Sequence, residues 1–211
     1  MITMQLPASL VQLAHERIEP FDCEGFLPGA GPADATIMFV GEAPGETEIH
    51  NGIPFSGRAG VIFDSYLEDL NIKRDDIYVT SAVRSRPFKW GQTRAGVRRK
   101  YNRTPNQKEI QAHAPVLDYE ISQVQPQWLV PMGKIAYQRL LGKSPRLGDV
   151  TGRIQTHPVQ QWNEEANSYI WTKEHYNIFP IYHPAAILYN RSLEQTMKDY
   201  LNTLATHALH T

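Results

Sequence analysis

The chain has 211 residues, of which 41% are hydrophobic and 20% charged, and its formal net charge is −1. This composition excludes an extended disordered chain and is typical of one folded domain spanning residues 1–211. No apolar run reaches the roughly 18 residues of a membrane-spanning helix, and the first twenty residues lack the pattern of a signal peptide. We therefore expect a cytoplasmic protein without membrane attachment.

One cysteine, Cys23, excludes an internal disulfide and any site built from several thiolates. No spacing typical of metal ligands is found among His113, His157, His175, His207 and His210. We therefore expect no metal and no cofactor.

The first half of the chain alternates between helical and strand patterns. Leucines in residues 1–17 predict a short helix, and residues 18–35, rich in Pro and Gly, predict a loop. An apolar strand at about 36–41, a helix over 57–70 and a second strand at 77–83 follow.

Residues 84–103 have an unusual composition. They hold eight basic residues and no acid, with Phe88, Trp90 and Tyr101 between them. Long loops of this kind are usually functional or disordered. We expect a basic surface loop that contacts nucleic-acid phosphates, with a merely solvated charged loop as the alternative.

The second half of the chain repeats the alternation. It predicts a helix at 104–124, a strand at 128–132, a helix at 133–142, turns and short strands over 143–177, a strand at 178–182 and a helix at 191–208. Four strand–helix alternations predict an α/β fold with a parallel sheet covered on both faces.

This topology brings separate segments together. Glu42, Ser81, Gly133 and His183 each follow the carboxyl end of one predicted strand. Those ends lie along one edge of a parallel sheet, so we expect the four residues to share a cleft.

The loop after the first strand carries candidate chemistry. Glu42 and Glu48 could orient a water or stabilise a cationic sugar, and Phe55 could stack on a base. Alternatively, Glu42 caps backbone, Glu48 is solvated and Phe55 belongs to the core. The loop lacks the lysine and hydroxyl of a phosphate-binding P-loop and the spacing of a dinucleotide fingerprint.

His183 precedes Pro184, which restricts the histidine backbone to extended geometry. A neutral imidazole can donate one hydrogen bond to a developing oxyanion. The alternative is a histidine packed at a strand end.

These segments resemble a known family. Residues 41–45 (GEAPG), 54–60 (PFSGRAG) and 182–185 (YHPA) are similar to the signature motifs of the family 4 uracil-DNA glycosylases, and residues 78–87 and 102–105 fit the same pattern. The resemblance covers about residues 20–205.

The resemblance implies a three-layer α/β/α sandwich with a central four-stranded parallel sheet. It also implies hydrolysis of the N-glycosidic bond of uracil, or a related deaminated base, flipped out of DNA. The expected partner is DNA containing such a base, bound by a monomer.

The resemblance also implies residue roles. Glu42 and Glu48 would place the attacking water or stabilise charge on the sugar, in either order, and His183 would stabilise the departing uracil anion at O2. The substrate-binding set would be Gly41, Ala43, Gly45, Phe55 and Ser81. For contacts to DNA we expect Arg58, Arg84, Arg86, Arg98, Arg99, Lys100, Arg103 and Lys134.

The sequence departs from the family pattern in three places. Ser85 and His113 stand where the family carries cysteines for an iron–sulfur cluster, which is therefore expected to be absent. Ser81 replaces an asparagine that reads the uracil edge, which leaves base specificity open. Asn102 replaces the histidine of a branch that crosslinks to DNA, so no crosslinking is expected.

Two other functions stay open at this stage. Ser81 and the missing cluster are compatible with a catalytically weak protein that binds damaged DNA. A small-nucleotide hydrolase on the same fold would act on free nucleosides and not on DNA.

Overall fold

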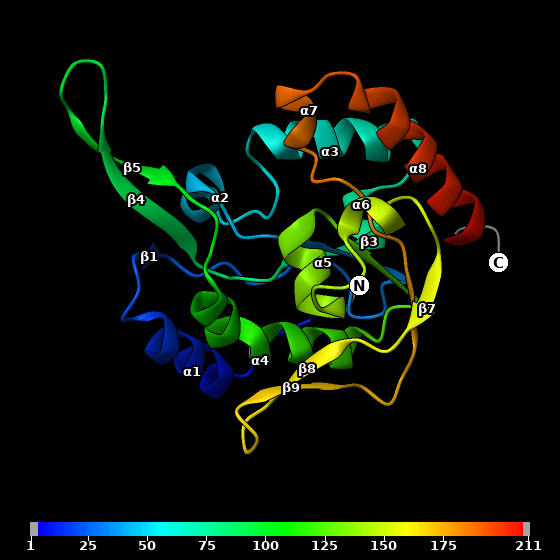
Figure 1. The fold of residues 1–211 in the computed structure, drawn as a ribbon, viewed down its shortest axis with the longest axis horizontal. Coiled ribbons are helices and arrows are strands. Elements are labelled where there is room, and N and C mark those ends of the chain that lie inside the picture. Colours follow the sequence, from blue (N-terminus) through cyan, green and yellow to red (C-terminus); the bar gives the residue numbers. More distant parts are fainter. Residues whose placement is uncertain (1–3, 209–211) are drawn as a thin grey trace.

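The computed structural model describes residues 4–208 as an α/β fold (Figure 1). Its central sheet has five strands in the order β3-β2-β6-β10-β7. These strands are β2 (Ile37–Gly41), β3 (Ile77–Ser81), β6 (Trp128–Pro131), β7 (Gln155–His157) and β10 (Tyr176–Ile178). The first four in the spatial order run parallel, and β7 pairs antiparallel with β10.

The sheet therefore differs from the expected four parallel strands by one added edge strand. The segment between β6 and β10 is too polar for a buried strand. It supplies the short edge strand β7, whose residues are exposed or half-buried.

Helices cover both faces of the sheet. One hydrophobic cluster joins β2 and β3 to α3 (Arg58–Asp69) and α8 (Leu193–Ala208), and the other joins them to α4 (Gln107–Val124) and α5 (Lys134–Leu141). Alternate residues of β2 point to opposite faces: Phe39 belongs to the first cluster and Met38 to the second. Strand β2 is buried along its whole length, which is typical of a strand covered on both sides.

The remaining elements lie around this core. They are α1 (Ala8–Ile18), β1 (Cys23–Glu24), α2 (Glu46–Asn51), the 3₁₀ turn Arg74–Asp76, α6 (Leu147–Val150), β8 (Gln160–Asn163), β9 (Ser168–Trp171) and α7 (Ala186–Tyr189). Helix α1 packs on α4, and β8 and β9 form a separate hairpin. No helix within residues 4–208 combines the length and the apolar character needed to cross a bilayer.

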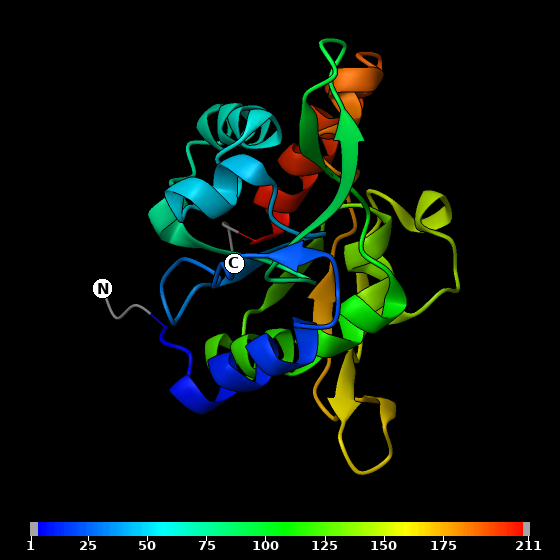
Figure 2. The ribbon, with the colours of Figure 1, turned by 90° about the vertical axis from the view of Figure 1, so that its left-hand side faces the viewer.

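The expected basic loop at 84–103 is instead largely a β-hairpin. Strands β4 (Arg86–Gln92) and β5 (Arg98–Asn102) pair antiparallel, and β1 adds a third strand along β4. The hairpin projects away from the rest of the molecule (Figure 1), and Figure 2 shows it rising beside the sheet. Phe88 and Trp90 alternate with polar residues, which is a strand pattern. A loop is expected from the sequence instead because the high content of basic residues outweighs this alternation.

Candidate active site

A cleft of about 1020 Å³ lies at the carboxyl ends of the parallel strands. The loop after β2, the hairpin and the segment after β10 all contribute to its walls. Of the residues expected at the site, the cleft is lined by Glu42, Ala43, Gly45, Glu48, Phe55, Arg58, Ser81, Arg86, Arg99, Lys100, Arg103 and His183. Glu42, Ser81 and His183, which follow three of the parallel strands, therefore meet in one cleft as expected. Gly133, the fourth residue expected there, does not line the cleft and lies behind His183, since a Cβ on it would be 3.0 Å from the Cβ of His183.

Phe55 is held in a fixed position at the floor of this cleft. Its backbone has φ +51°, and Arg74 donates hydrogen bonds to the carbonyl oxygens of Pro54 (2.6 Å) and of Phe55 itself. A Cβ on Gly41 would lie 2.5 Å from the ring, so the ring covers the glycine closely. The half-buried ring is thereby fixed and lines the cleft, where an aromatic ring can stack against a flat ligand.

His183 lies next to this ring, with 5.7 Å between the ring centroids and 31° between the planes. The backbone N–H of Ala185 donates to His183 Nδ1 at 3.1 Å. Burial lowers the pKa of His183 from 6.5 to about 4, opposed by the charge of Glu48. The imidazole is therefore neutral near pH 7, and because Nδ1 accepts, its proton lies on Nε2 as a hydrogen-bond donor.

The two glutamates have different surroundings. Glu48 accepts hydrogen bonds from the backbone N–H groups of Gly45 (3.1 Å) and Gly57 (2.8 Å), one on each carboxylate oxygen. It closes the loop by capping the start of α2. Glu42 is half-buried, and burial raises its pKa, opposed by a hydrogen bond with Thr104. A carboxylate with a raised pKa and no such capping role is suited to accept a proton.

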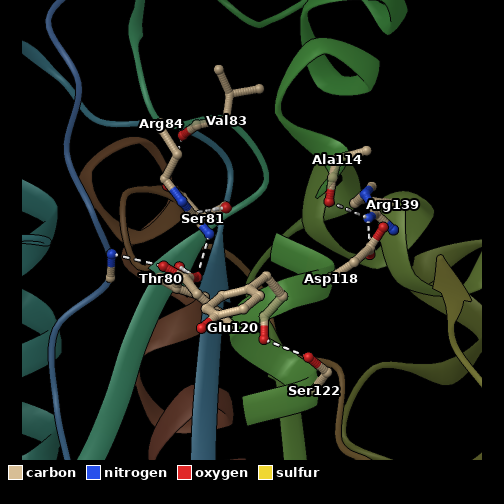
Figure 3. A network of polar contacts seen from close by, with 11 residues as sticks. Thr80, Ser81, Val83, Arg84, Ala114, Asp118, Glu120, Ser122 and Arg139 are labelled. Carbon is tan, nitrogen blue, oxygen red and sulfur yellow. Dashed lines mark hydrogen bonds and ion pairs between the residues drawn. The ribbon is translucent and has the colours of Figure 1, made fainter. Parts of the chain in front are cut away.

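Ser81 lies at the end of β3 within a buried polar network, drawn in Figure 3. Its hydroxyl donates to the Val83 carbonyl at 2.7 Å and accepts from Arg84 Nη1 at 3.2 Å. Arg84 also donates to the Ser81 carbonyl and forms an ion pair with Glu120. The network fixes the hydroxyl at the cleft wall.

Arg84 is 1% exposed, which corrects the expectation that it contacts DNA phosphates. Arg86 needs the same correction, since its side chain is 3% exposed. Arg86 donates to Glu24 (2.7 Å) and to Asn102 Oδ1 (2.6 Å), joining β1 to the hairpin. Arg84 supports the site from beneath its surface, whereas Arg86 lines the cleft wall and links β1 to the hairpin there.

Acids from other segments also pair with three further basic residues near the hairpin. Lys100 pairs with Glu24, Arg99 with Glu46 at 2.8 Å, and Arg103 with Glu109 through two hydrogen bonds of 2.6 and 2.8 Å. Only the Arg99–Glu46 pair is exposed, so Arg99 stays the most available of the three cations to an incoming phosphate, whereas Arg103 pairs with a buried carboxylate.

Three further residues expected to contact DNA are exposed. Arg98 is exposed, and its guanidinium lies 4.1 Å from the centroid of the Trp90 ring. Arg58 is exposed at the first turn of α3 and lines the cleft, whereas Lys134 is exposed at the start of α5 and does not line it. Gly41 contributes by its contact with Phe55 rather than as part of the lining.

Sequence reasoning missed several residues that line the cleft. Thr104 bonds to Glu42, and the Asn102 amide lies 3.0 Å from the position of a Cβ on Gly45. Leu188 and Tyr189 are 43% and 86% exposed on α7 at the cleft. The sequence signal that could have found Leu188 and Tyr189 is a pair of large apolar residues soon after the His183-Pro184 motif. Exposed apolar side chains of this kind can enter a base stack.

The residues at the expected cluster positions do not fit an iron–sulfur cluster. Ser85 and His113 lie 3.4 Å apart (Oγ to Nε2), and the pKa of the Cys23 thiol rises to about 12 through burial and the nearby Glu109. Among residues 4–208, no group of three or more His, Cys, Asp or Glu residues could hold a metal ion.

Protein contacts hold this region together. Arg103 donates to the Asp22 carbonyl at 3.2 Å and to the Phe88 carbonyl at 2.8 Å, in addition to its pair with Glu109. One arginine thereby joins the N-terminal segment, the hairpin and α4.

The fold and the cleft define a protein that can hold a planar base between Phe55 and polar groups at the edge of a parallel sheet. A sequence profile of the Uracil DNA glycosylase superfamily matches residues 28–205, and the chain belongs to this superfamily. The resemblance read from the motifs is confirmed.

Several curated relatives carry the name type-4 uracil-DNA glycosylase. The protein from Sulfurisphaera tokodaii is 34% identical over 176 residues, which cover 82% of this chain and 70% of the relative. The protein from Saccharolobus solfataricus is 31% identical, covering 82% of this chain and 71% of the relative. The protein from Archaeoglobus fulgidus is 28% identical, covering 81% and 75%.

Proposed function

We propose that the protein is a DNA repair glycosylase that hydrolyses the N-glycosidic bond of uracil in DNA. The observation that carries the proposal is one cleft that contains the Phe55 ring, the neutral His183 imidazole and the half-buried Glu42 carboxylate. Membership of the superfamily and the names of the relatives support the same reaction. Helices on both faces of the sheet support the expected three-layer arrangement.

The roles follow from the local chemistry. The flipped uracil stacks on Phe55, and His183 Nε2–H donates to O2 of the base. As the C1′–N1 bond breaks, its electron pair passes to the uracil, and the hydrogen bond stabilises the resulting anion. Water attacks C1′ and loses a proton, the uracil anion takes up a proton from the solvent, and the products are free uracil and an abasic site.

The two glutamates take separate roles in this proposal. Glu42 orients the attacking water and accepts its proton, since its pKa is raised and it faces the cleft. Glu48 uses both carboxylate oxygens to hold the loop, so its negative charge acts on the sugar only from a distance. This assignment separates two residues that the sequence left equivalent.

The DNA would lie along the hairpin side of the cleft. Arg98, Arg99 and Lys100 supply positive charge there, and Arg58 adds charge from the start of α3. Leu188 and Tyr189 on α7 supply an apolar edge that can fill the space left by the flipped nucleotide.

The test is release of uracil from single-stranded and double-stranded oligonucleotides. We expect release by the unaltered protein and a loss of about 100-fold or more in His183→Ala, because one preorganised donor to the leaving group is removed. His175→Ala alters an exposed histidine outside the cleft and serves as the matched control.

Absence of uracil, hypoxanthine and xanthine release would overturn the enzymatic proposal. Damage-dependent binding without release would then favour a DNA-binding protein. Activity on free nucleosides alone would favour a small-nucleotide hydrolase.

A further inference from the structure

The hydrogen-bonding capacity of Ser81 is nearly used up within the protein. A hydroxyl has one proton to donate and two lone pairs that accept. The proton is donated to the Val83 carbonyl (2.7 Å), and one lone pair accepts from Arg84 (3.2 Å). One accepting position therefore remains, and no donor.

The partners of Ser81 are themselves fixed. Glu120 is fully buried and accepts from the Gly29 backbone N–H (3.0 Å), from the Thr80 hydroxyl and from Arg84 (Figure 3). Arg84 is held in turn by the carboxylate and by the Ser81 carbonyl. Turning the Ser81 hydroxyl towards the cleft as a donor would leave the Val83 carbonyl without this partner.

We propose that Ser81 is a specificity-determining residue that reads the flipped base only as a hydrogen-bond acceptor, and that Arg84 and Glu120 are its positioning residues. An acceptor at this place pairs with a ring N–H and leaves the neighbouring carbonyl of the base unread. The inference rests on the proposed function, because Ser81 can read only a base that enters the cleft.

This arrangement defines a substrate class. Uracil has N3–H between two carbonyls, and hypoxanthine and xanthine have N1–H beside a carbonyl. Cytosine and adenine have an unprotonated ring nitrogen at the corresponding position. Ser81 thus favours the lactam edge that deamination creates, whereas an asparagine side chain would read the N–H and the carbonyl together.

Three oligonucleotides separate these two kinds of reading. They carry uracil, 4-thiouracil, which keeps N3–H but replaces the O4 acceptor, or N3-methyluracil, which lacks N3–H. Single-turnover release rates are compared within each protein, so that only ratios between bases are interpreted.

For the unaltered protein we expect 4-thiouracil to be released within about threefold of uracil, and N3-methyluracil to be released at least about 100-fold more slowly. Ser81→Asn adds a donor towards O4 and should open a gap of about tenfold between uracil and 4-thiouracil. Ser168→Asn, an exposed change on β9, should leave all ratios unchanged.

Ser81→Ala separates the loss of the hydrogen bond from Ser81 to N3–H from a steric effect of the methyl group in N3-methyluracil. We expect about tenfold slower uracil release and unchanged N3-methyluracil release. An unchanged uracil rate in Ser81→Ala would overturn the inference, as would a tenfold gap between uracil and 4-thiouracil in the unaltered protein.

Failure of the proposed function has a different signature. If no uracil is released at all, the glycosylase proposal fails, and the affinities of the protein for the same three oligonucleotides test Ser81 separately. Equal affinities for the uracil and N3-methyluracil strands would then overturn the acceptor role.

Discussion

The loop after β2 and the hairpin β4–β5 form walls of the same cleft, but their charged residues behave differently. In the loop, two glutamates six residues apart divide into a backbone cap, Glu48, and a half-buried acid with a raised pKa, Glu42. In the hairpin region, acids from distant segments pair with most of the arginines. The first region keeps a reactive charge for the cleft, and the second uses much of its charge to hold the fold.

This difference shows what a count of charges misses. Residues 84–103 contain no acid, yet Glu24, Glu46, Glu109 and Glu120 reach basic residues of this segment from elsewhere in the chain. The segment is therefore far less positive in space than in sequence. Arg98 is an exposed hairpin residue whose described contact is an aromatic ring rather than a carboxylate.

The largest expected effect tests the reactive side of the comparison. Glu42→Gln removes the proposed base but keeps the shape of the side chain, and we expect uracil release to slow by about 10²–10⁴-fold. Single-turnover kinetics with a uracil oligonucleotide measure the change. A rate within threefold of the unaltered protein would exclude Glu42 as the base.

The pH profile gives an independent reading of the same residue. Burial raises the pKa of Glu42 above its ordinary value of 4.5, whereas the pKa of His183 falls to about 4. Only deprotonated Glu42 is active as a base, so activity should fall as the pH drops through the raised pKa, before His183 gains its proton. The remaining activity of Glu42→Gln should not show the fall in rate that the titration of Glu42 causes.

The next effect concerns the buried ion pair on the hairpin side. Arg84→Met leaves the Glu120 carboxylate buried without its cation, and we expect a loss of about 3–5 kcal/mol in the free energy of unfolding. Urea denaturation measures it. Arg84→Met combined with Glu120→Gln should recover part of the loss, and no recovery would argue against charge burial as its cause.

A smaller effect is expected at the capping glutamate. Glu48→Gln retains one acceptor oxygen, so either Gly45 or Gly57 loses its partner, at a cost of about 1 kcal/mol in stability. The release rate should fall much less than in Glu42→Gln. Equal rate losses in the two variants would contradict the division of roles between the glutamates.

The smallest effect is expected at the exposed tip of the hairpin. Arg98→Gln should weaken DNA binding by a similar factor for all sequences and reduce the slope of log affinity against log salt by about 1. Fluorescence anisotropy across a salt series measures both. Lys173→Gln, an exposed change just beyond β9, is the matched control and should leave the slope unchanged.

The parallel strands and the residues at their ends could be predicted from the sequence. Continuous apolar runs such as residues 37–40 have one stable place, the middle of a covered sheet, and the topology then fixes where Glu42 and His183 lie. The sequence predicts short strands within residues 143–177, but it does not predict that β7 joins the central sheet, because that place depends on its pairing with β10.

The roles of individual charged side chains could not be predicted either. The difference between Glu42 and Glu48 depends on which backbone N–H groups face each carboxylate, and that is decided by the turn into α2. The burial of Arg84 depends on Glu120, which is 36 residues away in sequence. Local patterns carry no information on such tertiary pairs.

The fixed position of Phe55 affects how a damaged base would be found. Gly60 leaves no room for a side chain beside the Phe55 carbonyl, and Arg74 donates a hydrogen bond to the same carbonyl. Folding has therefore already ordered the stacking surface, so little ordering remains for substrate binding. Capture should then depend on how often the base leaves the helix, and uracil opposite guanine should be found faster than uracil opposite adenine.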